Sequence, residues 1–219
     1  MSKTMLLAAI TLAQLLRDCA PSVSPKTMTA IVRVESGGNS LALRDNSLGR
    51  AFAPGSTAEA VAWANQLLAM GHSLDLGLSQ VNSANLPMLG LTVRAAFDPC
   101  TNLQAGATIL GADYRNAAQH FGTGQYALRR AIGAYNSGSL YAGQDYVNEI
   151  LAAAGLAPET GYVPDIQAAT GSESGSLPPG VSAPKAKAKR GIPGTDATPG
   201  PAYTIQRTPG SSVTVLVGN

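Results

Sequence analysis

Apolar residues recur every three or four positions along most of the chain as far as Leu156, and strict alternation of apolar and polar residues is rare. The longest such pattern runs from Leu103 to Phe121 and covers about five helical turns. We expect a long central helix here, with Thr101 as its N-terminal cap and Gly122 as its end. The pattern therefore predicts an all-α domain up to Leu156.

The same spacing predicts shorter helices at about residues 6–17, 25–36, 57–70, 125–135 and 144–154. Ser56 and Glu59 form a capping box at the start of the third of these. Region 39–54 is rich in Asp, Asn, Ser and Gly, so we expect a loop or at most a small β-hairpin there. Segment 76–82 fits either a short strand or the entry to a helix. Prolines and glycines limit segment 83–99 to short helical turns.

The predicted helix at 25–36 carries a glutamate in an unusual position. Ser24 suits the N-cap, Pro25 suits the first helical position, and Gly37 suits the left-handed exit. Glu35 shares the apolar face with three other residues, Met28, Ile31 and Val32. Burial and the negative end of the helix dipole both favour the neutral form of a carboxyl there, which suits a general acid. The alternative is a glutamate at a helix end with its head group in water.

The other carboxylates before Leu156 have simpler explanations. Glu59 belongs to the capping box, and Glu149 falls on the outer side of the last predicted helix. Asp45 follows Glu35 by ten residues and is the one aspartate expected to approach it. The other aspartates are expected at helix ends or on exposed faces: Asp75, Asp98, Asp113 and Asp145. No nucleophile elbow and no phosphate-binding glycine loop is present.

The composition changes after the predicted domain. Nine of the 14 prolines follow Leu156, among Gly, Ser, Thr and Ala. We therefore expect a folded domain at residues 1–156 and a flexible tail at 157–219, because the tail has too little apolar surface to fold alone. The tail contains one basic run, Lys185–Arg190, and a strand-prone end, Ser212–Val217. This end is suited to pairing with the sheet edge of a partner protein. The alternative is a disordered terminus.

Charge and hydropathy argue against two broad classes of protein. Charged residues make up 13% of the chain and the net charge is +2, which does not suit a nucleic-acid binder. No apolar run is long enough to span a membrane as a helix. Lys3 and the apolar residues after it resemble a weak secretory leader without a convincing cleavage site, so we favour a first helix of the domain.

Two cysteines, Cys19 and Cys100, fit either one disulfide in an oxidising compartment or two buried free thiols. His72 and His120 are isolated, and no Cys-x-x-Cys pair exists. We therefore expect no metal site and no cofactor.

Three short motifs resemble those of a known family. Glu35-Ser36, Gly77-Leu78-Ser79-Gln80 and Ala134-Tyr135-Asn136-Ser137-Gly138 resemble, in order and spacing, the signature motifs of the lysozyme-like lytic transglycosylases. Cys19-Ala20-Pro21, Leu76 to Asn82 and Phe97 to Cys100 are closer still to the VirB1-like members that serve type IV secretion and conjugation systems. The resemblance covers about residues 15–156.

This resemblance implies a lysozyme-like fold with Glu35 in a cleft. It implies cleavage of the β-1,4 bond between N-acetylmuramic acid and N-acetylglucosamine in peptidoglycan. Glu35 would protonate the leaving oxygen and then accept the proton of the muramic acid 6-hydroxyl, which closes a 1,6-anhydro ring. Since the substrate hydroxyl replaces water, one carboxylate suffices where ordinary glycoside hydrolysis uses two.

The resemblance also implies roles for other residues. Tyr135 would orient Glu35 by a hydrogen bond, and Gln80 would contact the sugar acetamido groups. Ser36 and Asn136 would shape the site, and Tyr146 would line its far side. The implied location is the periplasm or cell envelope, with peptidoglycan strands as substrate and secretion components as partners of the tail.

Two alternatives stay open from the sequence. One is a hydrolytic muramidase that uses Asp45 as a second carboxylate. The other is a weakly catalytic scaffold that docks onto a secretion channel through its tail.

Overall fold

The computed structural model describes residues 11–157, which are mainly helical. The predicted all-α class is confirmed. The helices of this described part are α1 (Leu12–Cys19), α2 (Pro25–Ser36), α3 (Thr57–Ala69), α4 (Leu86–Leu89), α5 (Pro99–Phe121), α6 (Gln125–Ser137) and α7 (Gln144–Ala153). Short 3-10 turns at Ser83–Asn85 and Ala95–Phe97 flank α4, as expected for segment 83–99.

Several sequence predictions lie outside the described residues. These are the leader-like segment, the part of the first predicted helix that contains Leu6 and Ile10, and the tail with its basic run and its strand-prone end.

A small antiparallel sheet accompanies the helices. The expected hairpin is present as β1 (Leu43–Asp45) and β2 (Arg50–Phe52). β3 (Leu74–Leu76) and β4 (Val81–Asn82) extend it to four strands in the order β2-β1-β3-β4. The sheet is thus larger than a hairpin, because β3 pairs with β1 in the core.

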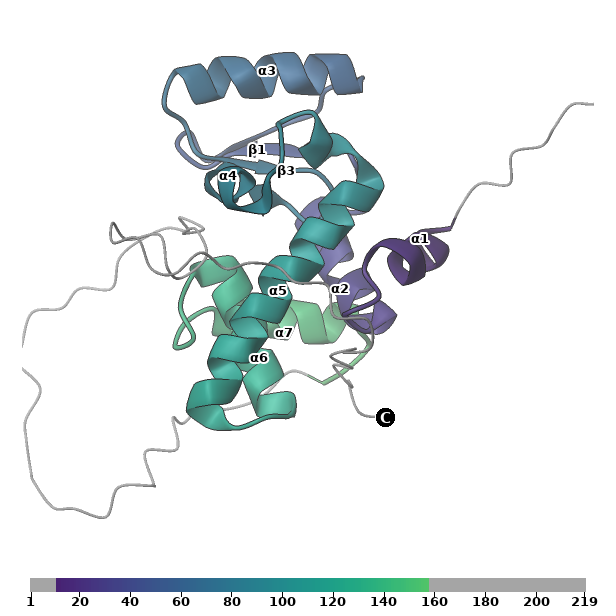
Figure 1. Cartoon of the computed structure of the whole chain (residues 1–219), viewed down its shortest axis with the longest axis vertical. Helices are drawn as coiled ribbons and strands as arrows, with labels where there is room; N and C mark the ends of the chain where they lie inside the picture. The colour runs from purple at the N-terminus through teal and green to yellow at the C-terminus, as the bar shows by residue number, and fades with distance from the viewer. Residues whose placement is uncertain (1–10, 158–219) are drawn as a thin grey trace, which may run out of the picture.

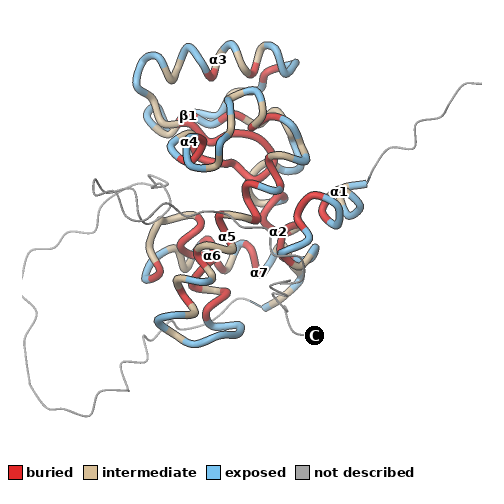
Figure 2. The backbone as a smooth tube through the Cα atoms, viewed as in Figure 1, coloured by how far each residue is buried: buried red, intermediate tan, exposed pale blue. Residues whose placement is uncertain are grey.

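α5 passes through the middle of the molecule and joins its two ends (Figure 1). The sheet, α3 and α4 lie at one end, and α6 and α7 lie at the other. Figure 2 shows that the buried backbone is concentrated along α2, α5 and the sheet. A disulfide joins Cys19, the last residue of α1, to Cys100 in the first turn of α5, which decides between the two cysteine alternatives.

The helix ends show which capping signals are used. Asp98, not Thr101, caps α5: its Oδ1 accepts the Thr101 backbone N–H at 2.8 Å and the Thr101 hydroxyl at 2.7 Å. Pro99 occupies the first position, which moves the start of the helix three residues earlier than predicted. Ser24 stands at the N-cap of α2 but accepts no capping hydrogen bond. Gly37 ends α2 in the left-handed conformation, as expected.

The predicted capping box at α3 is half present. Ser56 Oγ accepts the Glu59 N–H at 3.2 Å, as predicted. The Glu59 carboxylate accepts the N–H of Gly55 at 2.7 Å, one residue before the cap. The Glu59 carboxylate is therefore engaged in a hydrogen bond at the start of α3.

Two aspartates expected at helix ends or on exposed faces are instead buried. Asp75 lies in β3 and accepts a hydrogen bond from Asn82 at 2.9 Å. Asp113 lies on the inner face of α5, 4% exposed, and burial raises its pKa to about 7. Helical spacing alone does not predict this, because the face of α5 that carries Asp113 is covered by α6.

The burial of Asp113 predicts a pH dependence of stability. Below about pH 4 the carboxyl is neutral in both the folded and the unfolded chain. Between about pH 4 and pH 7 the unfolded chain ionises while the folded chain keeps the proton, so stability falls as the pH rises. The full loss, above about pH 7, is at most ~4 kcal/mol.

Asp113→Asn should remove the loss of folding stability that this carboxyl causes as the pH rises. Urea unfolding from pH 4 to pH 8 measures it, with Asp145→Asn on the exposed side of α7 as a control for charge removal. Equal slopes for wild type and Asp113→Asn would show that Asp113 does not titrate as a buried acid.

Candidate active site

Glu35 lies one residue before the end of α2 and is partly buried. The hydroxyl of Tyr146, in the first turn of α7, donates a hydrogen bond to Glu35 Oε1 at 2.6 Å. The two residues are 111 positions apart in the sequence. Burial raises the pKa of the Tyr146 hydroxyl well above its usual range, and the charge of Glu35 adds to this effect. The hydroxyl is therefore a neutral donor throughout the working pH range.

Tyr135 binds the segment that follows β3. Its hydroxyl donates its proton to the backbone carbonyl of Ser79 at 2.7 Å, so the tyrosine that donates to Glu35 is Tyr146. Tyr135 is buried but electrostatically close to the site. Burial first, and then the charges of Glu35, Asp75 and Asp113, raise its pKa. Tyr135 thus fixes the position of the β3–β4 turn beside Glu35.

Ser36 holds the same turn from α2. Its hydroxyl donates to the carbonyl of Leu78 at 2.8 Å. The turn that joins β3 to β4, residues 77–80, is therefore bound by the residue after Glu35 and by Tyr135. Asn136 lies next to Tyr135 near the end of α6 and is partly exposed. The structure thus joins Ser36 and Tyr135 through this turn, which contains Gln80, and it joins Tyr146 directly to Glu35.

The side chain of Gln80 supports the turn. It is buried, and its Nε2 donates to the carbonyls of Gly77 at 2.9 Å and Ala42 at 3.2 Å. Its backbone is in the left-handed region, with φ of 47°. The amide nitrogen therefore stabilises the turn, and the contact of Gln80 with sugar acetamido groups stays a prediction.

Asn102 on α5 is a site residue that sequence reasoning missed. Its Oδ1 accepts the Ser79 N–H at 2.7 Å, and its Nδ2 donates to the carbonyls of Leu76 at 2.8 Å and Ala96 at 2.7 Å. It is 1% exposed, so these bonds satisfy a side chain that would otherwise be costly to bury. The sequence carried one signal for this role: an asparagine one helical turn before Gly106, on the inner face of the helix.

Gly106 allows α5 to approach the turn closely. A Cβ atom at this position would lie 2.6 Å from Ser79 Cβ and 3.1 Å from the Tyr135 hydroxyl oxygen. Ser79 itself is fully buried against this helix. A larger residue at position 106 would push the turn away from α5.

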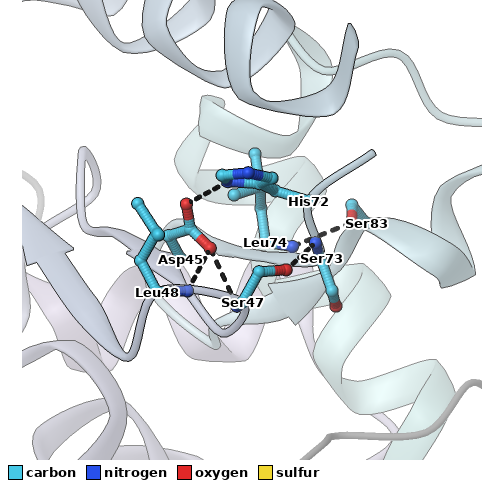
Figure 3. A network of polar contacts seen from close by, with 7 residues as sticks. All are labelled: Asp45, Ser47, Leu48, His72, Ser73, Leu74 and Ser83. Atoms are coloured by element: carbon cyan, nitrogen blue, oxygen red, sulfur yellow. Dashed lines mark hydrogen bonds and ion pairs between the residues drawn. The ribbon is translucent and has the colours of Figure 1, made fainter. Parts of the chain in front are cut away.

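Asp45 is unavailable as a second carboxylate. It is fully buried in β1, where its Oδ1 accepts the N–H groups of Ser47 at 2.8 Å and Leu48 at 3.1 Å. Its Oδ2 is 2.6 Å from His72 Nδ1. Figure 3 shows the carboxylate facing the His72 ring. Burial acts to raise the pKa of Asp45, but these hydrogen bonds and the attraction of His72 outweigh it and lower the pKa below its usual value. Asp45 is a structural anion of the hairpin.

No group of three or more His, Cys, Asp or Glu residues within residues 11–157 is arranged to hold a metal ion.

The chain matches the family described as "Transglycosylase SLT domain" over residues 16–148. It is 43% identical over 142 residues to "Protein virB1" of Agrobacterium fabrum (strain C58), an alignment that covers 63% of this chain and 57% of that protein. It is 41% identical over 148 residues to "Type IV secretion system protein virB1" of Brucella abortus biovar 1 (strain 9-941), covering 64% and 62%. The alignments thus span about three fifths of each relative's length. No solved structure is significantly similar to the chain.

A double-mutant cycle tests the bond between Tyr146 and Glu35. Tyr146→Phe and Glu35→Ala should show a coupling free energy of about 1 kcal/mol, because each change removes one partner of the same hydrogen bond. Urea unfolding measures it. The control cycle pairs Glu35→Ala with Tyr114→Phe, since the Tyr114 hydroxyl on α5 belongs to a separate contact, in which it accepts the N–H of Gly124 at the start of α6. A coupling for Tyr146 no larger than the control would contradict the contact.

Proposed function

The chain belongs to the transglycosylase SLT domain family, and on this premise we propose that it is a peptidoglycan lytic transglycosylase. It cleaves the β-1,4 bond between N-acetylmuramic acid and N-acetylglucosamine and leaves a 1,6-anhydro end. The observation that carries the proposal is the environment of Glu35. Its carboxyl is partly buried at a helix end and is held by the Tyr146 hydroxyl, and Asp45 is sequestered from it.

The reaction uses Glu35 first as an acid and then as a base. Tyr146 donates to Oε1, which favours the acidic proton on Oε2. Glu35 transfers this proton to the glycosidic oxygen as the bond to the muramic acid C1 breaks. The resulting carboxylate then takes the proton of the muramic acid 6-hydroxyl, whose oxygen bonds to C1. The proton given in the first step is thus recovered in the second, and no water is consumed.

The β3–β4 turn supports this chemistry by limiting movement around Glu35. Ser36, Tyr135 and Asn102 bind its carbonyl and amide groups from three helices. A group whose neighbours are fixed by packing and hydrogen bonds loses little entropy when the substrate is bound. Ser36, Tyr135 and Asn136 are therefore proposed as residues that shape the site.

A hydrolytic muramidase is not favoured. A retaining or inverting hydrolase needs a second carboxylate positioned at the sugar or at a water molecule. Asp45 was the candidate, but its Oδ1 is bound within the hairpin, its Oδ2 is bound to His72, and its side chain has no exposed surface.

The relatives suggest where the enzyme acts. One of them is named as a type IV secretion system protein, so we propose that this chain opens the cell wall locally for such an apparatus. The corresponding location is the periplasm or cell envelope. Within residues 11–157, no helix has the length and apolar character needed to cross a bilayer. Docking through residues 157–219 stays a prediction from the sequence.

Replacing the acid tests the proposal. Glu35→Gln should lower the rate of lysis of purified peptidoglycan by about 10²-fold or more, because the amide transfers no proton. Release of soluble fragments measures the rate, and circular dichroism shows that the variant is folded. Glu149→Gln, on the exposed side of α7, is the matched control and should keep full activity. Unchanged lysis by Glu35→Gln would remove Glu35 from the mechanism.

A further inference from the structure

Three aromatic rings gather where α5 turns into α6 and where the α6–α7 loop returns. Phe121 ends α5, Tyr126 lies in the first turn of α6, and Tyr141 lies in the loop. The Phe121 ring is 5.5 Å from the Tyr126 ring and 5.8 Å from the Tyr141 ring, with edge-on geometry in both pairs. We call these three residues the aromatic patch.

The patch is exposed although its rings are large. Tyr141 is 67% exposed and Tyr126 is 42% exposed. A tyrosine as exposed as Tyr141 contributes little to folding, because most of its surface stays in water. Fold stability therefore does not account for the Tyr141 ring, which lies against Phe121 at the surface.

A buried arginine fixes the patch from beneath. Arg130 donates to the Tyr126 hydroxyl at 2.6 Å and to the carbonyl of Leu140 at 3.2 Å. Its guanidinium also lies 5.2 Å from the Phe121 ring centre and 4.9 Å from the Tyr126 ring centre, within the range of cation–π contacts. One side chain thus connects the end of α5, the start of α6 and the loop that carries Tyr141.

The loop itself is closely packed. A Cβ atom on Gly143 would lie 2.6 Å from the carbonyl oxygen of Gly133, so the returning loop contacts α6 directly. The backbone N–H of Tyr141 donates to Ser139 Oγ at 3.2 Å. Rings held in this way lose little conformational entropy on binding a ligand, which is the property that makes tyrosine effective in recognition surfaces.

The patch is continuous with the active site through the chain. The loop begins just after Asn136 and ends just before Tyr146, which donates to Glu35. Tyr146 follows Tyr141 by five positions, so their Cα atoms are at most about 18 Å apart. A polymer that occupies the active site extends over such a distance.

We propose that the aromatic patch binds a sugar ring of the glycan strand outside the two sugars that Glu35 separates. The apolar C–H face of a pyranose ring packs on the exposed Tyr141 ring, and the tyrosine hydroxyls hydrogen-bond to the sugar hydroxyl or acetamido groups. The inference rests on the proposed function, because it takes the same polymer as ligand. The patch increases affinity for long strands and leaves the chemical step unchanged.

The test measures binding without turnover. Glu35→Gln protein is sedimented with insoluble purified peptidoglycan, alone and combined with Tyr141→Ala. We expect Tyr141→Ala to weaken binding about fivefold to tenfold. Tyr141→Phe should bind nearly as well as the parent, because it keeps the ring. Met70→Ala, an equally exposed apolar residue at the end of α3, is the control and should have no effect; α3 lies at the opposite end of the molecule (Figure 1).

The outcomes separate the two proposals. If Glu35→Gln abolishes lysis but Tyr141→Ala binds peptidoglycan as tightly as its parent, the proposed function stands and the glycan site is wrong. If Tyr141→Ala affects only binding to another protein, the patch is a protein interface and the glycan site is equally wrong. If Glu35→Gln still lyses peptidoglycan, the proposed mechanism fails, whatever Tyr141 does.

Discussion

The hydrogen bond from Tyr146 to Glu35 is the contact around which the site is organised. It joins the end of α2 to the start of α7, and neither helix alone fixes the carboxyl. The two helices meet because their apolar faces pack together over the core. A tyrosine whose pKa is raised by burial keeps its proton, so it can donate to one carboxyl oxygen while the other takes part in proton transfer. The single acid therefore depends on the packing of α2 against α7.

A second constraint is the fixed position of the β3–β4 turn. Asn102 bonds to this turn and to the segment before α5, and Gly106 removes the side chain that would hold the turn away from α5. Ser36 and Tyr135 bind the turn from α2 and α6. The turn requires a left-handed backbone at Gln80, whose amide is used inward to support it. These contacts make the surroundings of Glu35 rigid before substrate arrives.

The sequence was informative where local signals decide the structure. Pro25 and Gly37 mark the ends of the Glu35 helix. The spacing of apolar residues predicts α5 to α7, and the majority of their predicted ends lie within about two residues of the observed ends. It was less informative where the outcome depends on packing between distant segments. Contacts between helices or turns decide which of Tyr135 and Tyr146 donates to Glu35. They also decide whether the Gln80 amide faces inward and whether Asp113 is covered by α6. Cap choice at α5 was decided by Pro99, which made Asp98 the better cap than Thr101.

The central claim is that Glu35 works alone and that the substrate's own hydroxyl closes the ring. Mass spectrometry of the fragments released from purified peptidoglycan, with digestion in heavy-oxygen water, tests it most directly. The account predicts fragments that end in 1,6-anhydro-N-acetylmuramic acid and carry no oxygen from the solvent. Fragments that end in reducing N-acetylmuramic acid and carry the heavy oxygen would show hydrolysis by water and would contradict it.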